Sequence, residues 1–279
     1  MNLSEEKVLI TGKGQIGTSL REELLTLGAT KVHIFDIDEM DITDASAVKE
    51  TFSRLEPTLV FHTSALTKVD YCERNPEEAM RVNADGTKNV VEMARELRAR
   101  LIYFSTDYVF PGKDDGEYYE DEEPAPLNAY GRSKLAGEKH VGNYENGFIV
   151  RTAQVFAAGG RNFLAAIRNK LERRQEVQVV SDEIATPTYA PHLARALLKL
   201  TPVAQHKVYH LRGAEALSYY EWAVRFAKLA GFEAELIKPI SASEFARDAQ
   251  RPKRAVLSIQ RFLSEGFSAL PPLDEAMND

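Results

Sequence analysis

The chain has 279 residues, of which 44% are hydrophobic and 28% are charged, and its formal net charge at pH 7 is −7. This is the composition of an ordinary globular protein that is long enough to bury a large core. Because the chain is acidic and contains no basic block, it gives no support to binding of nucleic acid or of an anionic membrane.

The termini and the cysteine content indicate the cellular setting. The N-terminal segment is polar and acidic, so we expect no signal or transit peptide. No apolar run approaches the roughly 20 residues that a bilayer span needs. Cys72 is the only cysteine, which excludes an intrachain disulfide and a thiolate metal cluster. We interpret Cys72 as a small helix-flanking residue rather than a nucleophile, and we expect a cytoplasmic protein.

Hydrophobic periodicity predicts short strands that alternate with amphipathic helices in the first half of the chain. Asp44 is expected to cap one helix, and Asn75-Pro76 is expected to open a long helix that ends near Leu97. The predicted strands are 7–10, 31–35, 58–62, 101–104 and 148–150. Strands that alternate with helices indicate a parallel sheet that is covered on both faces.

The second half of the chain has a less regular pattern. The acidic segment between Asp107 and Asn128 is predicted to be a solvated loop rather than a metal site. Beyond Arg151, the predicted helices lie near 162–174, 190–200 and 218–230, and the predicted strands near 177–180 and 207–211.

These patterns predict an α/β fold: a Rossmann-type doubly wound parallel sheet with a second, smaller α/β substrate domain. We place a dinucleotide-binding domain at 1–155 and a substrate-binding region at 156–279. Segments near 177–215 are candidates to cross back to the first domain.

The first strand runs into a glycine-rich turn, Gly12-Lys13-Gly14-Gln15-Ile16-Gly17, and then into a helix. In such a motif, glycines permit a tight turn, close approach of a pyrophosphate and close helix–strand packing. Asp36 ends the second strand 19 residues after Gly17 (36 − 17), where a carboxylate binds the adenosine ribose hydroxyls. Asp36 would repel a 2′-phosphate, so NAD(H) is the preferred cofactor. Lys13 partly offsets that repulsion, which leaves NADP(H) open.

A second motif is Tyr130-x-x-x-Lys134 on a predicted helix. The i, i+4 spacing places both side chains on one face. A lysine ammonium beside a phenol is expected to lower the pKa of the phenol, which favours proton donation to a carbonyl oxygen. Ser105-Thr106 follows the strand at 101–104, and ligands of α/β proteins bind at the carboxyl ends of parallel strands.

With these motifs in hand, the chain resembles the extended short-chain dehydrogenase/reductases, and more narrowly the dTDP-4-dehydrorhamnose reductase family. The resemblance spans nearly the whole chain. Besides the glycine turn and Asp36, the segments that carry it are 41–44, 105–110, 126–138, 150–152, Asn162-Phe163, 186–188 and Arg251-Pro252.

The resemblance implies a reductase that acts on a nucleotide-linked 4-keto-6-deoxysugar. It makes Thr106, Tyr130 and Lys134 the catalytic residues: Tyr130 protonates the oxygen as hydride arrives, and Lys134 also binds the nicotinamide ribose. The residues that it places at the cofactor are Gly12, Gly14, Gln15, Ile16, Gly17, Asp36, Asp41, Ile42, Thr63, Ser64, Ala65, Tyr130 and Lys134. Those that it places at the substrate are Thr106, Asn128, Gln154, Asn162 and Arg251.

The chain also departs from the family pattern. Its glycine turn is one residue shorter, Gln154 stands where the family usually has Trp, and Arg254 stands where a small or amide residue is usual. A non-catalytic NAD(P)-binding regulatory subunit, resembling that of methionine adenosyltransferase, is therefore the alternative. Sugar 4,6-dehydratases carry an acidic pair after the Thr, whereas Thr106 is followed by Asp107-Tyr108. We predict no metal site, and the chain is a candidate homodimer.

Overall fold

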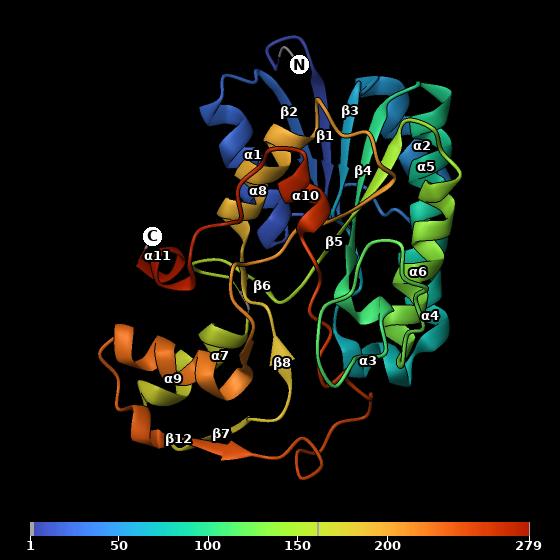
Figure 1. The fold of residues 1–279 in the computed structure, drawn as a ribbon. Helices are drawn as coiled ribbons and strands as arrows, with labels where there is room; N and C mark the ends of the chain where they lie inside the picture. Colours follow the sequence, from blue (N-terminus) through green and yellow to red (C-terminus); the bar gives the residue numbers. More distant parts are fainter. Residues whose placement is uncertain (1–2, 161, 279) are drawn as a thin grey trace.

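A computed structural model describes residues 3–160 and 162–278 (Figure 1). The helices are α1 Gln15–Thr26, α2 Ala45–Leu55, α3 Val69–Arg74, α4 Pro76–Met80, α5 Gly86–Glu96, α6 Ala129–Gly142, α7 Phe163–Leu171, α8 Ala190–Leu200, α9 Tyr219–Leu229, α10 Gln260–Ser264 and α11 Leu273–Asn278. The strands are β1 Lys7–Thr11, β2 Lys31–Phe35, β3 Leu59–His62, β4 Arg100–Thr106, β5 Gly147–Thr152, β6 Val155–Phe156, β7 Val177–Val180, β8 Ile184–Ala185, β9 Thr188–Tyr189, β10 Val208–His210, β11 Leu217–Ser218 and β12 Ile237–Ile240.

Six strands form the central sheet in the order β10-β5-β4-β3-β1-β2, and every neighbouring pair is parallel. The chain adds β2 on one side of β1 and then continues with β3 on the other side, so the strand order reverses at β1. In doubly wound sheets, ligands bind outside the carboxyl ends of the strands at such a reversal. The predicted fold class is therefore confirmed.

The two faces of the sheet have separate cores because alternate residues of each strand point to opposite faces. Helices α1 and α8 cover one face, and α2, α5 and α6 cover the other (Figure 1). Val8 and Ile10 of β1 pack with Leu20 of α1 and Leu197 of α8, whereas Leu9 packs on the opposite face in the core that α2 and α5 complete. Both cores are built from buried aliphatic and aromatic side chains.

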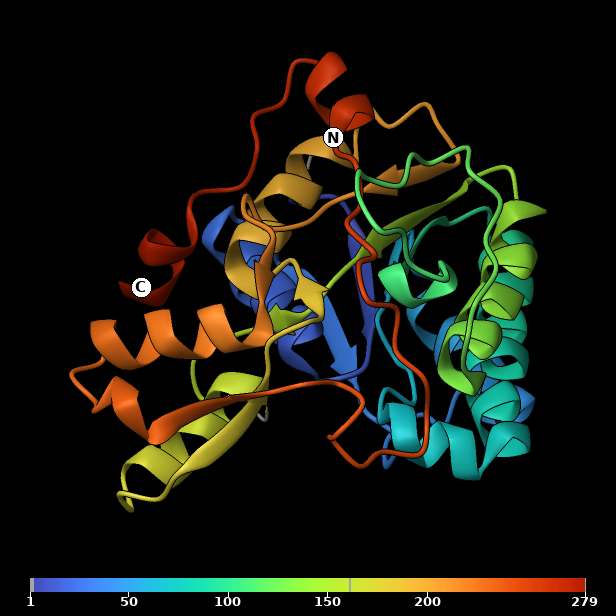
Figure 2. The ribbon, with the colours of Figure 1, turned by 60° about the horizontal axis from the view of Figure 1, so that its bottom comes forward.

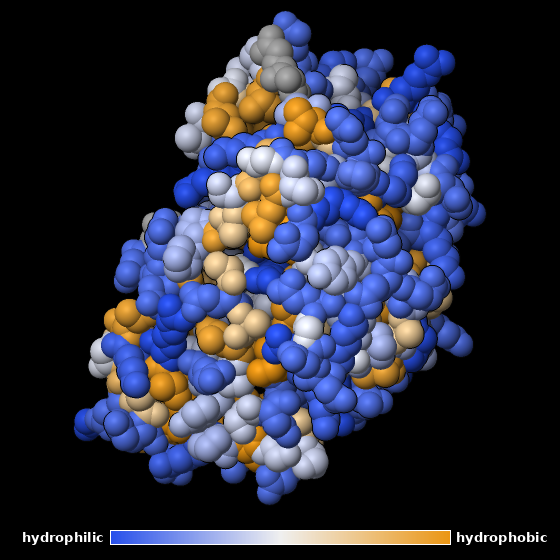
Figure 3. All heavy atoms as spheres, in the orientation of Figure 1, coloured by the Kyte–Doolittle hydropathy of each residue, from blue (hydrophilic) through white to orange (hydrophobic). Residues whose placement is uncertain are grey.

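A smaller second region holds α7, α9, β7 and β12 and forms the lower left of Figure 1; Figure 2 shows it from below. Its core surrounds Trp222, whose side chain is buried against Phe156 and Phe163. Short strands pair as β7 with β12, β8 with β11 and β6 with β9. Hydrophilic residues cover most of the face shown in Figure 3, and hydrophobic ones form separate small patches.

The chain crosses back to the sheet after entering the second region. Helix α8 packs against α1, and β10 forms the edge of the central sheet beside β5. Strand β7, in contrast, stays in the second region, where it pairs with β12. The sequence thus visits the second region twice, before and after these two returning elements.

The segment 107–128 differs from the solvated loop that its composition predicts. Phe110 and Tyr118 are buried and stack with ring centroids 4.1 Å apart. They belong to a small core with Ala255 and Leu257 from the C-terminal part of the chain. Many of its acids are paired with basic residues, as in the ion pair between Glu117 and Arg212, so their charge gives no reason for the loop to stay fully hydrated.

Local predictions hold where caps and spacing decide the structure. Asp44 caps α2, since its Oδ1 accepts from the backbone N–H of Ser46 at 2.8 Å. The long helix predicted after Asn75-Pro76 is present, but a π-helical turn at Arg81–Asp85 divides it into α4 and α5. In the described part of the chain, no helix is both long and apolar enough to cross a membrane.

Candidate active site

The carboxyl ends of the central strands open into a cavity of about 1480 Å³. Its walls come from the glycine turn, the segments that follow β2, β3 and β4, helix α6 and the second region. Cavities that hold one small ligand have roughly 300–1,000 Å³, so this cavity has room for two ligands side by side.

At each glycine of the turn, the structure shows a different reason for the absence of a side chain. Gly12 has a φ of 91°, a conformation that L side chains rarely adopt. A Cβ on Gly17 would lie 2.0 Å from the carbonyl oxygen of Gly12, so α1 can approach β1 only without a side chain there. Gly14 lines the cavity, and a Cβ on it would meet no atom within 4 Å. The space over Gly14 is therefore free to receive a ligand.

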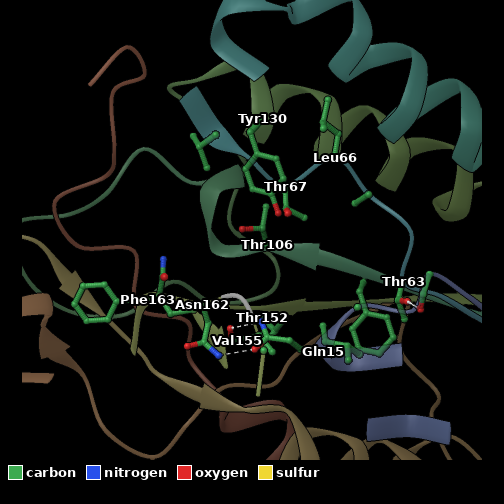
Figure 4. A pocket seen from close by; sticks show the side chains of 18 of the residues that line it. Gln15, Thr63, Leu66, Thr67, Thr106, Tyr130, Thr152, Val155, Asn162 and Phe163 are labelled. Carbon is green, nitrogen blue, oxygen red and sulfur yellow. Dashed lines mark hydrogen bonds between the residues drawn. The ribbon is translucent and has the colours of Figure 1, made fainter. Parts of the chain in front are cut away.

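Gln15 and Asn162, which we expected at cofactor and substrate respectively, bind one another across the cavity wall. Asn162 Nδ2 donates to Gln15 Oε1 at 2.8 Å, and the backbone N–H of Ala157 donates to the same oxygen at 2.8 Å. Gln15 Nε2 donates to the carbonyl oxygen of Val155 at 3.2 Å (Figure 4). The two side chains still line the cavity, but they tie the glycine turn to the second region.

Gly17 is not part of the cavity lining, whereas the remaining residues expected at the cofactor are. At one end, Asp36 Oδ1 accepts from the backbone N–H of Ile37 at 2.9 Å. Asp41 Oδ1 accepts from both the N–H and the hydroxyl of Thr43 at 2.8 Å, so this carboxylate holds its own turn. The other expected residues on the lining are Ile16, Ile42, Thr63, Ser64 and Ala65.

Thr106, Tyr130 and Lys134 meet at the middle of the cavity. Thr106 ends β4, and the two others lie one turn apart on α6. In Figure 4 the hydroxyls of Tyr130 and Thr106 point toward the same space. Lys134 is buried, with its Nζ 4.1 Å from the ring centroid of Tyr103. The i, i+4 spacing thus places Tyr130 and Lys134 one turn apart on α6, and both line the cavity.

The charge states of these groups differ from the sequence-based expectation. Burial raises the pKa of Tyr130 above its ordinary value; the negative charge of Asp107 adds to this, and a hydrogen bond with Thr106 opposes it. The expectation that Lys134 lowers the pKa of this phenol is therefore wrong for the free protein, because desolvation dominates. Burial also lowers the pKa of Lys134 to about 7, and Glu138 opposes that shift.

Asp107 is a cavity residue that the sequence reasoning left without a role. Its carboxylate Oδ1 accepts from the Thr106 hydroxyl at 2.8 Å, and burial raises its pKa to about 7. Its position directly after Thr106, at the carboxyl end of β4, was the signal that could have identified it. Ser105 and Thr152 are further cavity residues, and within the described chain their buried hydroxyls have no hydrogen-bond partner.

Arg251 lines the cavity where it approaches the second region. Its Nη1 and Nη2 bind Asp70 Oδ1 and Oδ2 at 2.6 and 2.8 Å. This guanidinium lowers the pKa of Asp70 to about 2. Arg247 lines the same part of the cavity and is held by Glu183 in the same two-bond manner.

Of the other residues expected at the substrate, Gln154 lines the cavity, with a φ of 43°. Asn128 does not. Its Oδ1 accepts from the N–H of Gly131 at 2.9 Å, which caps α6, and its Nδ2 donates to the carbonyl oxygen of Gln250 at 2.8 Å. Asn128 is fully buried, so these two bonds use its amide for positioning α6 and the C-terminal segment.

The parallel sheet with its reversal, the glycine turn and the Tyr–Lys pair on α6 together define the class of protein: the chain is an extended short-chain dehydrogenase/reductase. It belongs to the family described as RmlD substrate binding domain, whose model matches residues 6–279.

Named relatives agree with this membership. The spore coat polysaccharide biosynthesis protein SpsK of Bacillus subtilis is 33% identical over 90% of this chain and 89% of its own length. The dTDP-4-dehydrorhamnose reductase of Mycolicibacterium smegmatis is 33% identical over 100% of this chain and 86% of its own. The crystal structure of dTDP-4-dehydrorhamnose reductase from Bacillus anthracis, in complex with NADP, has a TM-score of 0.93 and 35% identity, covering 98% of this chain and 97% of that one. These relatives do not favour the alternative of a non-catalytic regulatory subunit.

Proposed function

We propose that this protein is an NAD(P)H-dependent reductase of a nucleotide-linked 4-keto-6-deoxysugar, similar to dTDP-4-dehydrorhamnose reductase. The observation that carries the proposal is the meeting of Thr106, Tyr130 and Lys134 in one cavity with the glycine turn. The relatives, which include reductases of this name at 33% identity, support the same reaction. Residues 1–155 would supply the cofactor subsite, and residues within 156–279 would complete the sugar subsite.

The cavity fits a dinucleotide at its glycine turn. The free space above Gly14 and the N-terminal N–H groups of α1 suit a pyrophosphate. Asp36 suits the adenosine ribose. The hydroxyls of Ser105 and Thr152, which have no hydrogen-bond partner among residues 3–160 and 162–278, suit polar groups of a bound molecule. When bound, the reduced nicotinamide supplies hydride to the carbonyl carbon.

The residues of the chain then control the proton. Tyr130 is a neutral phenol in the free protein, because burial raises its pKa, and it donates its proton to the carbonyl oxygen as negative charge develops there. In the free protein the Thr106 hydroxyl donates its one proton to Asp107. It would turn from Asp107 to the carbonyl oxygen of the substrate and so help to position it. Lys134 would orient the cofactor ribose and, when charged, stabilise the phenolate that remains on Tyr130.

The direct test is turnover. Purified protein with dTDP-linked 4-keto-6-deoxysugar should consume NADH or NADPH, followed by absorbance of the reduced nicotinamide. Tyr130→Phe removes the proton donor and keeps the ring, so kcat should fall by about 10²–10⁴-fold while cofactor affinity and Tm are kept. Tyr119→Phe is the matched control, since Tyr119 is exposed and outside the cavity lining. A Tyr130→Phe protein with near wild-type turnover would contradict the mechanism.

The nucleotide of the substrate is tested separately. Thermal shift with dTDP, UDP and GDP in the presence of cofactor should show strong stabilisation by one of them, since a ligand that binds the folded state raises Tm by mass action. Stabilisation by UDP or GDP alone would support the proposed reductase reaction, but with a substrate that carries that nucleotide instead of dTDP. Stabilisation by none, together with absent turnover, would contradict the proposed function.

A further inference from the structure

An ion pair contacts the backbone of Asp36, the residue that binds the adenosine ribose in the proposed function. Lys13 Nζ lies 2.5 Å from Glu39 Oε2. The same oxygen accepts from the backbone N–H of Asp36 at 2.9 Å. Glu39 is therefore held from two sides, by a side chain of the glycine turn and by the backbone at the end of β2.

The two partners of Glu39 line the cavity, whereas Glu39 itself is not part of the lining. Glu39 is therefore joined to the cavity wall through its contacts with Lys13 and with the backbone of Asp36. The side chains of Lys13 and Glu39 are about two-fifths exposed, at 41% and 42%, so the pair is open to solvent and to exchange of partners. The contact with Lys13, and then that with the Asp36 backbone, lowers the pKa of Glu39, which keeps it ionised.

The two nicotinamide cofactors differ at the 2′ position of this ribose. NAD has a hydroxyl there, which donates a hydrogen bond to a carboxylate at the end of the second strand. NADP has a phosphate there, which needs a nearby cation. Asp36 suits the 2′-hydroxyl of NAD, and Lys13 suits the 2′-phosphate of NADP. These two side chains alone therefore do not determine which cofactor is preferred. Arg81, another cation on the lining, donates to the hydroxyl of Thr43.

We propose that Glu39 determines the cofactor preference: by binding Lys13 it withholds the cation that a 2′-phosphate needs, and so it favours NAD(H) over NADP(H). This inference rests on the proposed function, because it requires that the cavity binds a nicotinamide dinucleotide. A 2′-phosphate would have to displace Glu39 from Lys13, and it would also meet the carboxylate of Asp36 on the cavity lining.

The test is the ratio of the dissociation constants for NADPH and NADH, measured by isothermal titration. Glu39→Gln should tighten NADPH binding by about 2–5-fold and leave NADH binding nearly unchanged, an effect of the size of a partly exposed ion pair. The gain should shrink at high salt, because the charges are screened. Asp38→Asn is the matched control: it removes one exposed acid at the neighbouring position, outside the cavity lining.

A second variant separates action through Lys13 from a general effect of charge. In a Lys13→Gln background, Glu39→Gln should no longer improve NADPH binding. An unchanged ratio in Glu39→Gln, an equal gain in Asp38→Asn, or an equal gain in the Lys13→Gln background would each overturn the inference. Those results leave the reductase intact, whereas failure of the wild-type protein to bind either cofactor would overturn the proposed function as well.

Discussion

At the scale of single residues, the main effect in the cavity is desolvation. Tyr130, Lys134 and Asp107 are all titratable, and burial is the largest cause of the pKa shift of each. Burial penalises the charged form, so it favours neutral phenol, neutral amine and neutral carboxylic acid. A bound ligand or cofactor that brings charge into the cavity would change these states, which links chemistry to occupancy.

Asp107 makes the stability of the free protein depend on pH. Its carboxyl ionises near 3.8 in the unfolded chain and near 7 in the folded protein. Between these values the folded state keeps a proton that the unfolded state releases, so the free energy of unfolding falls as pH rises from about 4 to 7. Asp107→Asn has no carboxyl group and so does not lose this stability. We therefore expect the Tm of the variant minus the Tm of the wild type to be about 2–8 °C higher at pH 8 than at pH 4.

Differential scanning calorimetry of the cofactor-free protein at both pH values checks this expectation. Asp107→Asn also weakens the acceptor for Thr106. The weaker hydrogen bond should change the Tm of the variant by a similar amount at pH 4 and at pH 8. The change in the Tm difference between the two pH values therefore reports the pKa of Asp107. A Tm difference that does not change with pH would show that Asp107 keeps an ordinary pKa.

At the scale of elements, the site depends on how closely α1 approaches β1. The three glycines of the turn have different surroundings, although the sequence motif treats them alike. Gly17 lies against the backbone of Gly12, whereas Gly14 lies against open space at the start of α1. One glycine therefore serves packing, and the other keeps the cavity free.

This difference predicts opposite outcomes for two alanine variants. Gly17→Ala would force a Cβ to 2.0 Å from a carbonyl oxygen, so it should lower Tm by several degrees or prevent folding. Gly14→Ala should keep the wild-type Tm and weaken the binding of NADH, because the new methyl group occupies the space proposed for the pyrophosphate. Thermal melts followed by cofactor titration check both. Tight binding of NADH by Gly14→Ala would show that the pyrophosphate does not bind above Gly14.

At the scale of the whole molecule, the C-terminal segment is fastened to the first region by ion pairs. Asp70 of α3 binds the guanidinium of Arg251 and also accepts from the backbone N–H groups of Asp248 and Ala249. Asp70 thereby fixes the position of Arg251 on the cavity wall, and Nη1 also donates to the carbonyl oxygen of Ala249 at 2.6 Å. Because Nη1 and Nη2 already hold Asp70, a diphosphate would bind at the Nε edge of the planar guanidinium, which can also contact two oxygens.

Arg251→Ala should raise KM for the nucleotide-sugar with little change in KM for NADH, because a phosphate anchor acts on substrate binding. Loss of one charge-assisted contact corresponds to about 10-fold or more in KM. Arg254→Ala is the matched control, since Arg254 belongs to the same basic segment but donates to the carbonyl oxygen of Gly116 outside the cavity. Steady-state kinetics of both variants decides. An unchanged KM for the sugar in folded Arg251→Ala would contradict the assignment.

Local patterns in the sequence determined the longer strands and helices, the glycine turn and the spacing of Tyr130 and Lys134 on one helix, because each depends on spacing within a few residues. Only the tertiary structure decided the partners that lie far apart in the chain. Asn162 meets Gln15 over 147 residues, and Arg251 meets Asp70 over 181. The pKa of Tyr130 likewise depends on burial, which neighbouring residues do not reveal. Periodicity encodes which face of an element is buried, but it does not encode which distant segment covers that face.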